Sequence, residues 1–147
     1  MEKTFDLIDL EKITKNLLSI IKKGVKNGAT ILAFSGDLGA GKTTTTKEIA
    51  RQLGVKERVI SPTFVIMKKY KTKDLKHKNL IHIDAYRLNK SEELLRLGWE
   101  EMIANKNNLI IVEWPERVIE CLPKDIYNLK LEHKDDTTRT LKLGYNI

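Results

Sequence analysis

The stretch that decides the fold is Thr30-Ile31-Leu32-Ala33-Phe34-Ser35-Gly36-Asp37-Leu38-Gly39-Ala40-Gly41-Lys42-Thr43. Its first half is an apolar, partly β-branched run, which is typical of a buried strand in a parallel sheet. Its second half matches G-x-x-x-x-G-K-[ST], the phosphate-binding loop of P-loop proteins. A helical pattern follows from about residue 42 to 53 and ends at Gly54, so the motif lies between a strand and a helix. The sequence therefore predicts a site for a nucleoside triphosphate.

Each residue type in this loop has a physical reason to be there. The glycines allow successive backbone N–H groups to turn toward phosphate oxygens, and the helix N-terminus that follows favours an anion. Lys42 provides a positive charge for the β- and γ-phosphates, and Thr43 provides a hydroxyl ligand for Mg²⁺. We therefore expect the cofactors ATP and Mg²⁺, with the nucleotide held by Gly36, Asp37, Leu38, Gly39, Ala40, Gly41, Lys42, Thr43 and Thr44.

Length and composition limit what surrounds the loop. The 147 residues predict a single domain, and 41% hydrophobic with 32% charged residues is typical of an ordinary globular chain. There is no apolar stretch of about 20 residues and no basic-then-apolar leader, and Cys121 is the only cysteine. These features predict a cytoplasmic protein without a membrane segment. The net charge of +7 includes a lysine-rich segment at residues 68–78, which is either a footprint for RNA or acidic protein or a compositional habit of a Lys- and Asn-rich chain.

Hydrophobic periodicity predicts an α/β fold: a P-loop NTPase-like sheet with central parallel strands, antiparallel hairpins and flanking helices. Strands are predicted at residues 58–60, 63–70, 80–84 and 109–114, with a terminal hairpin at 126–132 and 138–143. Helices are predicted at residues 10–23, 91–94 and 99–104, and residues 71–78 are expected to form an exposed connection. In the first helix, Asp9 is the expected cap; the apolar stripe consists of Leu10, Ile13, Leu17, Ile20 and Ile21, with Thr14 beside it.

A P-loop needs further oxygen ligands for the metal, and two predicted strands end in a carboxylate. These are Asp84 and Glu113, each directly after an apolar run. Strand ends beside a P-loop point into one crevice, so both side chains are candidates for metal binding, and Asp84 is also a candidate for orienting the attacking water. The alternative is that one of them caps a helix or pairs with Arg87 or Arg117. His82, two residues before Asp84, either supports that carboxylate or is an ordinary buried sheet histidine.

Two further segments are ambiguous when read alone. Ser61-Pro62-Thr63-Phe64 is either a plain turn or a switch loop that senses the γ-phosphate, with Ser61 and Thr63 as its nucleotide-facing hydroxyls. Trp114 follows Glu113, so strand alternation places it on the opposite side of the sheet, where packing is the ordinary role. Three scattered histidines and one cysteine do not make a zinc site.

Taken in order, the P-loop, Ser61 to Phe64, His82-Ile83-Asp84-Ala85-Tyr86-Arg87-Leu88 and Glu113-Trp114-Pro115-Glu116 resemble the TsaE family, also called YjeE. The resemblance covers nearly the whole chain. It implies an ATP-binding and hydrolysing subunit required for tRNA N6-threonylcarbamoyladenosine (t6A37) modification, which acts on a complex of TsaD and TsaB. It also implies contact with tRNA only through that complex. On its own we expect the chain to be a monomer or weak dimer.

The same resemblance carries roles onto individual residues. It implies that Thr43 and Glu113 hold the metal, that Asp84 is the acidic residue of the family's H-x-D-x-Y-R motif, and that Trp114 is important for activity. It further implies that Thr14 in the first helix and Arg139 in the terminal hairpin lie near the nucleotide. With the roles argued from the residues themselves, we expect Thr43, Glu113 and Asp84 to surround the metal and Lys42, Asp84, Glu113 and Trp114 to be the catalytic residues. The chain differs from the family at Thr44-Thr45-Thr46 and in the lysine-rich segment at residues 68–78.

Two alternative functions remain open from the sequence. A small-molecule P-loop kinase would need an acceptor pocket and an arginine-bearing lid, and the six arginines here are scattered. A nucleotide-gated interaction module would dock on its partner without stimulated hydrolysis. Hydrolysis stimulated by a partner, or dependent on an acceptor, separates the three readings.

Overall fold

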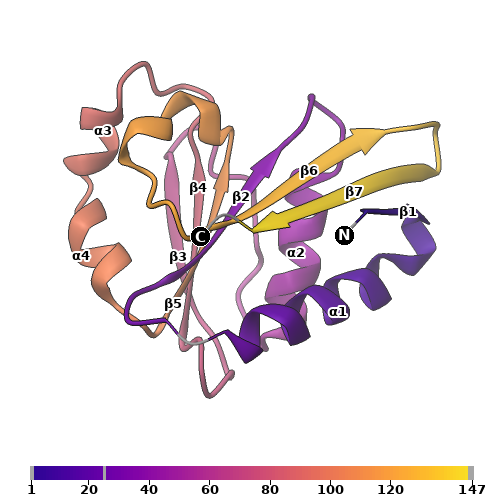
Figure 1. The fold of residues 1–147 in the computed structure, drawn as a ribbon, viewed down its shortest axis with the longest axis horizontal. Helices are drawn as coiled ribbons and strands as arrows, with labels where there is room; N and C mark the ends of the chain where they lie inside the picture. Colours follow the sequence, from indigo (N-terminus) through magenta and orange to yellow (C-terminus); the bar gives the residue numbers. More distant parts are fainter. Residues whose placement is uncertain (1, 25, 146–147) are drawn as a thin grey trace.

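One mixed sheet organises the fold, as seen in the computed structural model, which describes residues 2–24 and 26–145 (Figure 1). Within these residues seven strands lie in the order β1-β7-β6-β2-β5-β4-β3. The strands β6, β2, β5 and β4 are parallel, whereas β3, β7 and β1 run antiparallel to their neighbours. Their bounds are β1 Glu2–Asp6, β2 Thr30–Ser35, β3 Met67–Lys71, β4 Asn79–Asp84, β5 Asn108–Glu113, β6 Tyr127–His133 and β7 Thr138–Tyr145. The predicted α/β fold with central parallel strands and antiparallel hairpins is confirmed.

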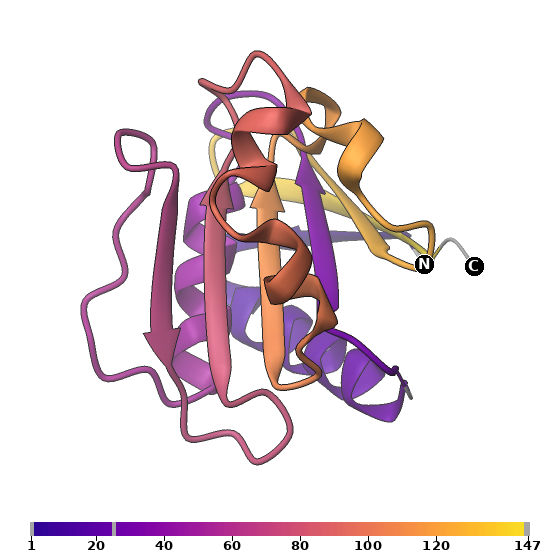
Figure 2. The same ribbon diagram turned by 90° about the vertical axis from the view of Figure 1, so that its left-hand side faces the viewer.

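Helices cover both faces of the sheet (Figure 2). Helices α1 (Leu10–Lys23) and α2 (Lys42–Gln52) lie on one face, and α3 (Ser91–Leu95) and α4 (Trp99–Ala104) lie on the other. Alternation along β2 supplies both cores: Leu32 and Phe34 face α1 and α2, whereas Ile31 and Ala33 face the opposite layer. Since β2 and β5 are buried along their lengths, the strand before the P-loop is held rigidly on both sides.

Short 3-10 turns complete the chain path, at Leu7–Asp9, Pro115–Arg117 and Ile119–Cys121. The last two follow β5 and help to cover the α3 and α4 face, where Trp99 donates its indole N–H to the carbonyl of Cys121 at 2.9 Å. Among the described residues, no helix combines the length and apolar character needed to cross a membrane.

The predicted helix 10–23 is confirmed, but its buried face differs from the predicted stripe. Ile20 is 38% exposed, while Leu18 and Thr14 are buried. Thr14 can be buried because its hydroxyl donates to the Leu10 carbonyl at 2.9 Å, one turn earlier. Asp9 precedes the helix, but its side chain makes no capping hydrogen bond, so the predicted cap is wrong.

The segment between α2 and β4 contains less strand than predicted. Residues 58–60 are not a strand, and β3 begins at Met67 instead of residue 63. The carbonyl of Pro62 accepts hydrogen bonds from the N–H groups of Val65 and Ile66, which closes a turn, and Ile66 has φ 69°. A chain folded back in this way cannot pair with β4. Strand β1, which pairs with β7, was not predicted.

Candidate functional site: the P-loop pocket

The glycine-rich loop after β2 takes backbone conformations that side chains disfavour. Gly36, Gly39 and Gly41 have φ of 140°, 79° and 101°. At Gly36 there is also no room, because a Cβ atom would lie 2.2 Å from the Leu131 carbonyl oxygen of β6. The loop is therefore pressed against a neighbouring strand at its start and free to present backbone N–H groups further along.

Lys42 lies folded over this loop at the start of α2. Its ammonium donates to the carbonyls of Asp37, at 2.9 Å, and Gly36, and it lies 4.4 Å from the centre of the Trp114 ring. Burial lowers the pKa of Lys42 below its ordinary value of 10.5, although the carboxylates of Glu113 and others act in the opposite direction. The Lys42 ammonium is thus held close to the loop by carbonyl groups and an aromatic ring. A phosphate would compete with these groups for the ammonium.

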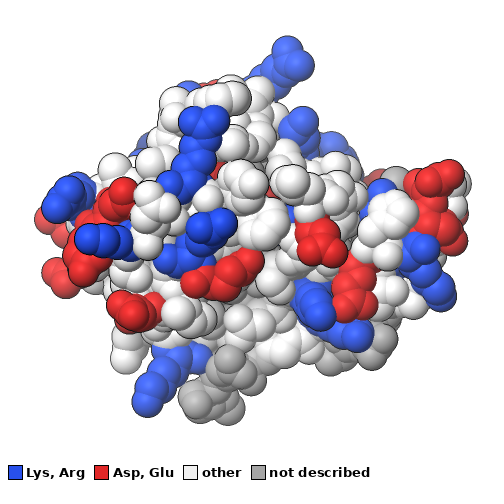
Figure 3. All heavy atoms as spheres, turned by 90° about the horizontal axis from the view of Figure 1, so that it is seen from above, with Lys and Arg blue, Asp and Glu red and all other residues white. Residues whose placement is uncertain are grey.

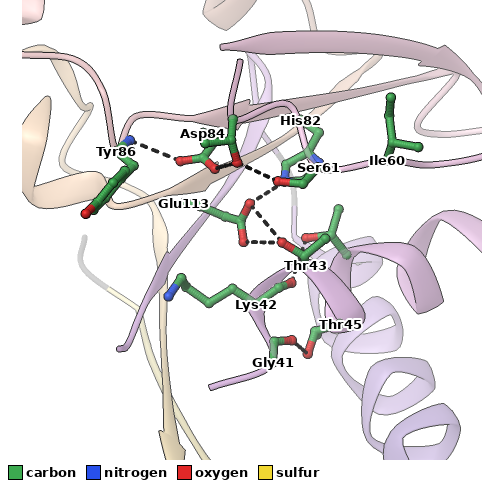
Figure 4. A network of polar contacts seen from close by, with 12 residues as sticks. Gly41, Lys42, Thr43, Thr45, Ile60, Ser61, His82, Asp84, Tyr86 and Glu113 are labelled. Atoms are coloured by element: carbon green, nitrogen blue, oxygen red, sulfur yellow. Dashed lines mark hydrogen bonds and ion pairs between the residues drawn. The ribbon is translucent and has the colours of Figure 1, made fainter. Parts of the chain in front are cut away.

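The two predicted carboxylates lie side by side at the carboxyl ends of β4 and β5. Asp84 pairs in register with Glu113, and alternation places both on the sheet face covered by α2. They are almost fully buried, at 6% and 2% exposed. The Thr43 hydroxyl donates to Glu113 Oε1 at 3.1 Å, as Figure 4 shows. The strand order thus brings both candidates for metal binding to the first turn of α2.

Asp84 links the pocket to the segment predicted to be a switch. Its carboxylate accepts from the Thr63 hydroxyl at 2.9 Å and from the backbone N–H of Tyr86 at 3.0 Å. Its own backbone N–H donates to the Ile66 carbonyl at 2.8 Å, and Thr63 lies 2.8 Å from Ser61 through their hydroxyls. Residues 61–66 are therefore attached to the site mainly through this one aspartate.

His82 does not support Asp84, which was one of the two roles left open by the sequence. Its Nε2 lies 2.8 Å from Glu113 Oε2, on the neighbouring strand, and not against Asp84 (Figure 4). In the sheet register His82 lies opposite Ile111, so Glu113 is its diagonal neighbour on β5. The longer Glu113 side chain reaches Nε2, whereas the Asp84 carboxylate is held by Thr63 and Tyr86. His82 is fully buried.

Trp114 packs on the side that alternation predicted and also reaches the pocket. Strand β5 ends at Glu113, and Trp114 takes a left-handed conformation with φ 58°. The ring packs against the core of the α3 and α4 face, and it also lies over Lys42 and 5.0 Å from the ring of Tyr86. The strand was predicted to end at Trp114, before Pro115; it ends one residue earlier, at Glu113, and Pro115 starts a 3-10 turn.

These side chains surround a cavity of about 280 Å³. The predicted residues that line it are Leu38, Gly39, Gly41, Lys42, Thr43, Thr44, Ser61, Thr63, Asp84, Glu113, Trp114 and Arg139. Larger hollows of about 420 and 580 Å³ lie beside α4 and between α1 and α2, but neither contains these carboxylates. The P-loop cavity is the candidate site because it combines the glycine-rich loop, Lys42 and two buried carboxylates, although it is smaller than these two hollows.

Four predicted nucleotide-binding residues do not line this cavity. Gly36, Asp37 and Ala40 belong to the P-loop but do not line the cavity. Gly36 and Asp37 instead accept hydrogen bonds from Lys42 through their carbonyls. Thr14 is buried between α1 and α2, where its hydroxyl accepts from Gln52 at 2.6 Å. Arg139 reaches the cavity from β7, and its guanidinium donates to the Asp135 carbonyl at 2.7 Å.

The donor set fits Mg²⁺ better than a metal held by protein alone. Among residues 2–24 and 26–145 no group of three or more His, Cys, Asp or Glu side chains could hold a metal ion. A hydroxyl and two adjacent carboxylates are oxygen ligands, and Mg²⁺ in nucleotide sites takes its other ligands from phosphates and water. Thr43, Glu113 and Asp84 are therefore the residues that would hold it.

Comparison with known proteins identifies the family. The family model described as threonylcarbamoyl adenosine biosynthesis protein TsaE matches residues 7–141. The chain belongs to the TsaE family. The TsaE protein of Rickettsia felis, named as a tRNA threonylcarbamoyladenosine biosynthesis protein, is 35% identical over 141 residues, which are 95% of this chain and 79% of that protein. The TsaE protein of Bacillus subtilis is 35% identical over 128 residues, covering 87% and 77%.

A solved structure agrees with this assignment. The crystal structure of Bacillus subtilis YdiB superposes with a TM-score of 0.71 and 27% sequence identity, and covers all of this chain and 87% of that one. The TsaE family is thus shown by sequence and by fold, as the four ordered motifs predicted. The family name places the chain in the biosynthesis of threonylcarbamoyladenosine in tRNA.

Proposed function

We propose that this TsaE-family chain is the Mg²⁺-dependent ATPase subunit of tRNA threonylcarbamoyladenosine biosynthesis, and that it acts in the cytoplasm on a complex of TsaD and TsaB. The observation that carries the proposal is the Thr43 hydroxyl bonded to the buried Glu113 carboxylate at the mouth of a complete P-loop. A hydroxyl and carboxylate in this relation are the protein ligands that P-loop ATPases use for Mg²⁺.

Each side chain then has a defined task. Lys42 leaves its loop carbonyls to neutralise the β- and γ-phosphates, while the loop N–H groups bind their oxygens. Thr43 and Glu113 hold Mg²⁺, which when bound neutralises charge on the β- and γ-oxygens. Asp84 either completes that shell or orients the water that attacks the γ-phosphate. Trp114 covers Lys42 and limits access of solvent to its charge.

Weak activity of the isolated chain follows from the arginines. Arg87, the arginine of the motif that contains Asp84, stacks on Phe64 at 4.4 Å and does not line the cavity. Arg139 lines it, but its Nη1 donates to two backbone carbonyls of its own hairpin, which ties the guanidinium to β7, while its buried Nε has no hydrogen-bond partner among the described residues. P-loop enzymes without an arginine finger hydrolyse at about 10⁻⁴ to 10⁻³ s⁻¹, so we expect acceleration to come from the partners.

The surface around the pocket fits a partner that responds to nucleotide. Leu38 of the P-loop and Phe64 and Val65 of the switch segment are 75%, 81% and 63% exposed. Figure 3 looks onto the end of the molecule at which the parallel strands finish, and it shows uncharged surface interspersed with charges of both signs. Apolar side chains on a mixed surface beside the pocket would let a docked protein sense the switch segment. Contact with tRNA would then be made through the complex.

ATP hydrolysis by the purified chain, alone and with TsaD and TsaB, tests the proposal, with Lys42→Ala as the blank. Strong stimulation by the pair that is lost in the blank supports the ATPase subunit. ATP binding without stimulation, but with ADP release that depends on an added nucleoside or sugar, would replace it with a kinase. Nucleotide-dependent docking without stimulated hydrolysis would replace it with an interaction module.

A further inference from the structure

We propose that His82 is a positioning residue, which fixes the Glu113 carboxylate in the orientation that Mg-ATP requires. The inference rests on the proposed ATPase function and adds to it a residue outside the cavity lining. Its basis is the geometry of one carboxylate held by two neighbours, which Figure 4 shows from close by.

The two oxygens of Glu113 are held from opposite elements. The Thr43 hydroxyl of α2 donates mainly to Oε1, at 3.1 Å, with a longer contact of 3.5 Å to Oε2, and His82 of β4 contacts Oε2 at 2.8 Å. Glu113 is 2% exposed and His82 is fully buried, so solvent cannot replace either contact readily. A glutamate side chain has three rotatable bonds, and these two contacts select one orientation among many.

The surroundings of the two ring nitrogens of His82 indicate which of them carries the hydrogen. The carboxylate can only accept, so Nε2 donates. Among the described residues, Nδ1 has no hydrogen-bond partner although it is buried. A neutral imidazole with its hydrogen on Nε2 leaves a bare lone pair at Nδ1 and avoids burying a second unpaired N–H. His82 is thus a donor aimed at Glu113 alone.

In the proposed function, binding of Mg-ATP would affect the Thr43 and His82 contacts of Glu113 differently. In the proposed function the Thr43 hydroxyl becomes a ligand of Mg²⁺, so its bond to Oε1 is exchanged for the metal. The His82 bond to Oε2 lies behind the carboxylate, in the core, and no ligand competes for it. His82 is therefore the contact that keeps Glu113 oriented in both states.

A second buried histidine shows what a purely structural role looks like. His77 is also fully buried, and its Nε2 lies 3.1 Å from the Thr30 hydroxyl. Thr30 is at the start of β2, at the opposite end of that strand from the P-loop. Among the described residues, the hydrogen bonds and the ion pair of His77 join it to Thr30, Thr72 and Asp74, none of which lines the pocket. His77→Gln is therefore a matched control for loss of a buried imidazole.

The test compares His82→Leu, His82→Gln, His82→Asn and His77→Gln in the full chain. Fluorescent ATP binding is measured in EDTA and across a Mg²⁺ titration, and hydrolysis with TsaD and TsaB is measured across the same titration. For His82→Leu we expect the Mg²⁺ concentration at half-effect to rise about ten-fold or more, because a buried bond to a charged acceptor is lost. Affinity for ATP in EDTA should change less than about two-fold, since the phosphate contacts of Lys42 remain. The longer Gln retains an N–H near the position of Nε2 and should restore much of the Mg²⁺ affinity.

Each outcome decides the assignment. A folded His82→Leu with the Mg²⁺ requirement of the wild type, or a requirement shifted equally by His77→Gln, overturns it. If His82→Leu does not fold, His82→Asn and His82→Gln decide: Asn is too short to reach Glu113, so equal Mg²⁺ requirements for the two overturn the role. If the wild type neither binds nor hydrolyses Mg-ATP, the proposed function falls and this inference with it. An active wild type with an unaffected His82→Leu rejects the inference alone.

Discussion

Gly36→Ala is the most informative perturbation of the fold at the site, because Gly36 is where the P-loop packs directly against β6. Its φ of 140° is a conformation that side chains rarely adopt, and a Cβ there would lie 2.2 Å from the Leu131 carbonyl oxygen. Leu131 cannot move away freely, because it pairs in register with Leu141 of β7. The substitution therefore combines backbone strain with a steric overlap that only a shift of the loop or the hairpin can relieve.

The expected magnitude follows from these two terms. Strain at a disfavoured backbone conformation costs about 1–3 kcal/mol. Relief of an overlap in packed surroundings costs about 1–3 kcal/mol more. Gly39→Ala is the matched control, since Gly39 has φ 79° but no atom within 4 Å of the added Cβ, so it carries only the strain. We therefore expect Gly36→Ala to lower the free energy of unfolding by about 2–6 kcal/mol, and Gly39→Ala by about 1–3 kcal/mol.

Urea denaturation followed by far-ultraviolet circular dichroism measures both values in water. A gap of about 2 kcal/mol corresponds to about 4–8 °C in the melting temperature of a chain of this size, so a thermal scan checks the result independently. Equal losses in the two variants, within about 0.5 kcal/mol, would refute the argument that contact with β6 restricts this position to glycine.

Three further predictions concern charge. Lys42→Ala should weaken ATP binding about 10- to 100-fold in calorimetry through the lost charge-assisted bonds to phosphate, and an unchanged affinity would remove the site assignment. Glu113→Ala should bind ATP in EDTA like the wild type but lose about 100-fold in partner-stimulated turnover, and a full-rate variant would contradict its metal role. Burial lowers the pKa of His77 below 6.5 despite the opposite pull of Asp74, so the unfolded chain binds the proton more readily and stability falls as pH drops below about 6.5. His77→Gln should flatten that slope in denaturation between about pH 7 and 5, and a slope like that of the wild type would show another group to be responsible.

The central sheet was predictable from sequence because its strands carry strong, repeated signals. In β2 and β5 nearly every residue is buried, so the apolar runs at residues 30–34 and 109–113 were unmistakable. Strand β1 had no such signal, because Glu2–Asp6 is mostly polar and is held by backbone pairing with β7 at the edge of the sheet. Residues 63–66 were wrongly predicted as strand, because their polar and apolar residues alternate as in a strand. The turn at Pro62 prevents them from pairing with β4.

The candidate site was predictable where sheet topology decides the geometry. Asp84 and Glu113 meet because parallel neighbouring strands end at the same edge, which order along the chain suggested. The partner of His82 depends on lateral register, and a single strand pattern contains no such information. The orientation of Trp114 depends on one positive φ, which local alternation rules do not foresee. The sequence pattern thus predicted which strand ends meet, but it contained neither the lateral register that gives His82 its partner nor the backbone angle at Trp114.

In the proposed mechanism, Asp84 is the residue through which bound nucleotide would reach the surface. Its carboxylate holds Thr63, and its backbone N–H holds the carbonyl of Ile66, a β-branched residue at φ 69°. A conformation of this kind costs about 1–3 kcal/mol and persists only because neighbouring bonds maintain it. If Asp84 turns to the metal or to the attacking water, its bond to Thr63 is exchanged, and less holds Ile66 in the strained state. Phe64 and Val65 lie between these two attachment points and are exposed, so a small change at the carboxylate would be presented directly to a docked partner.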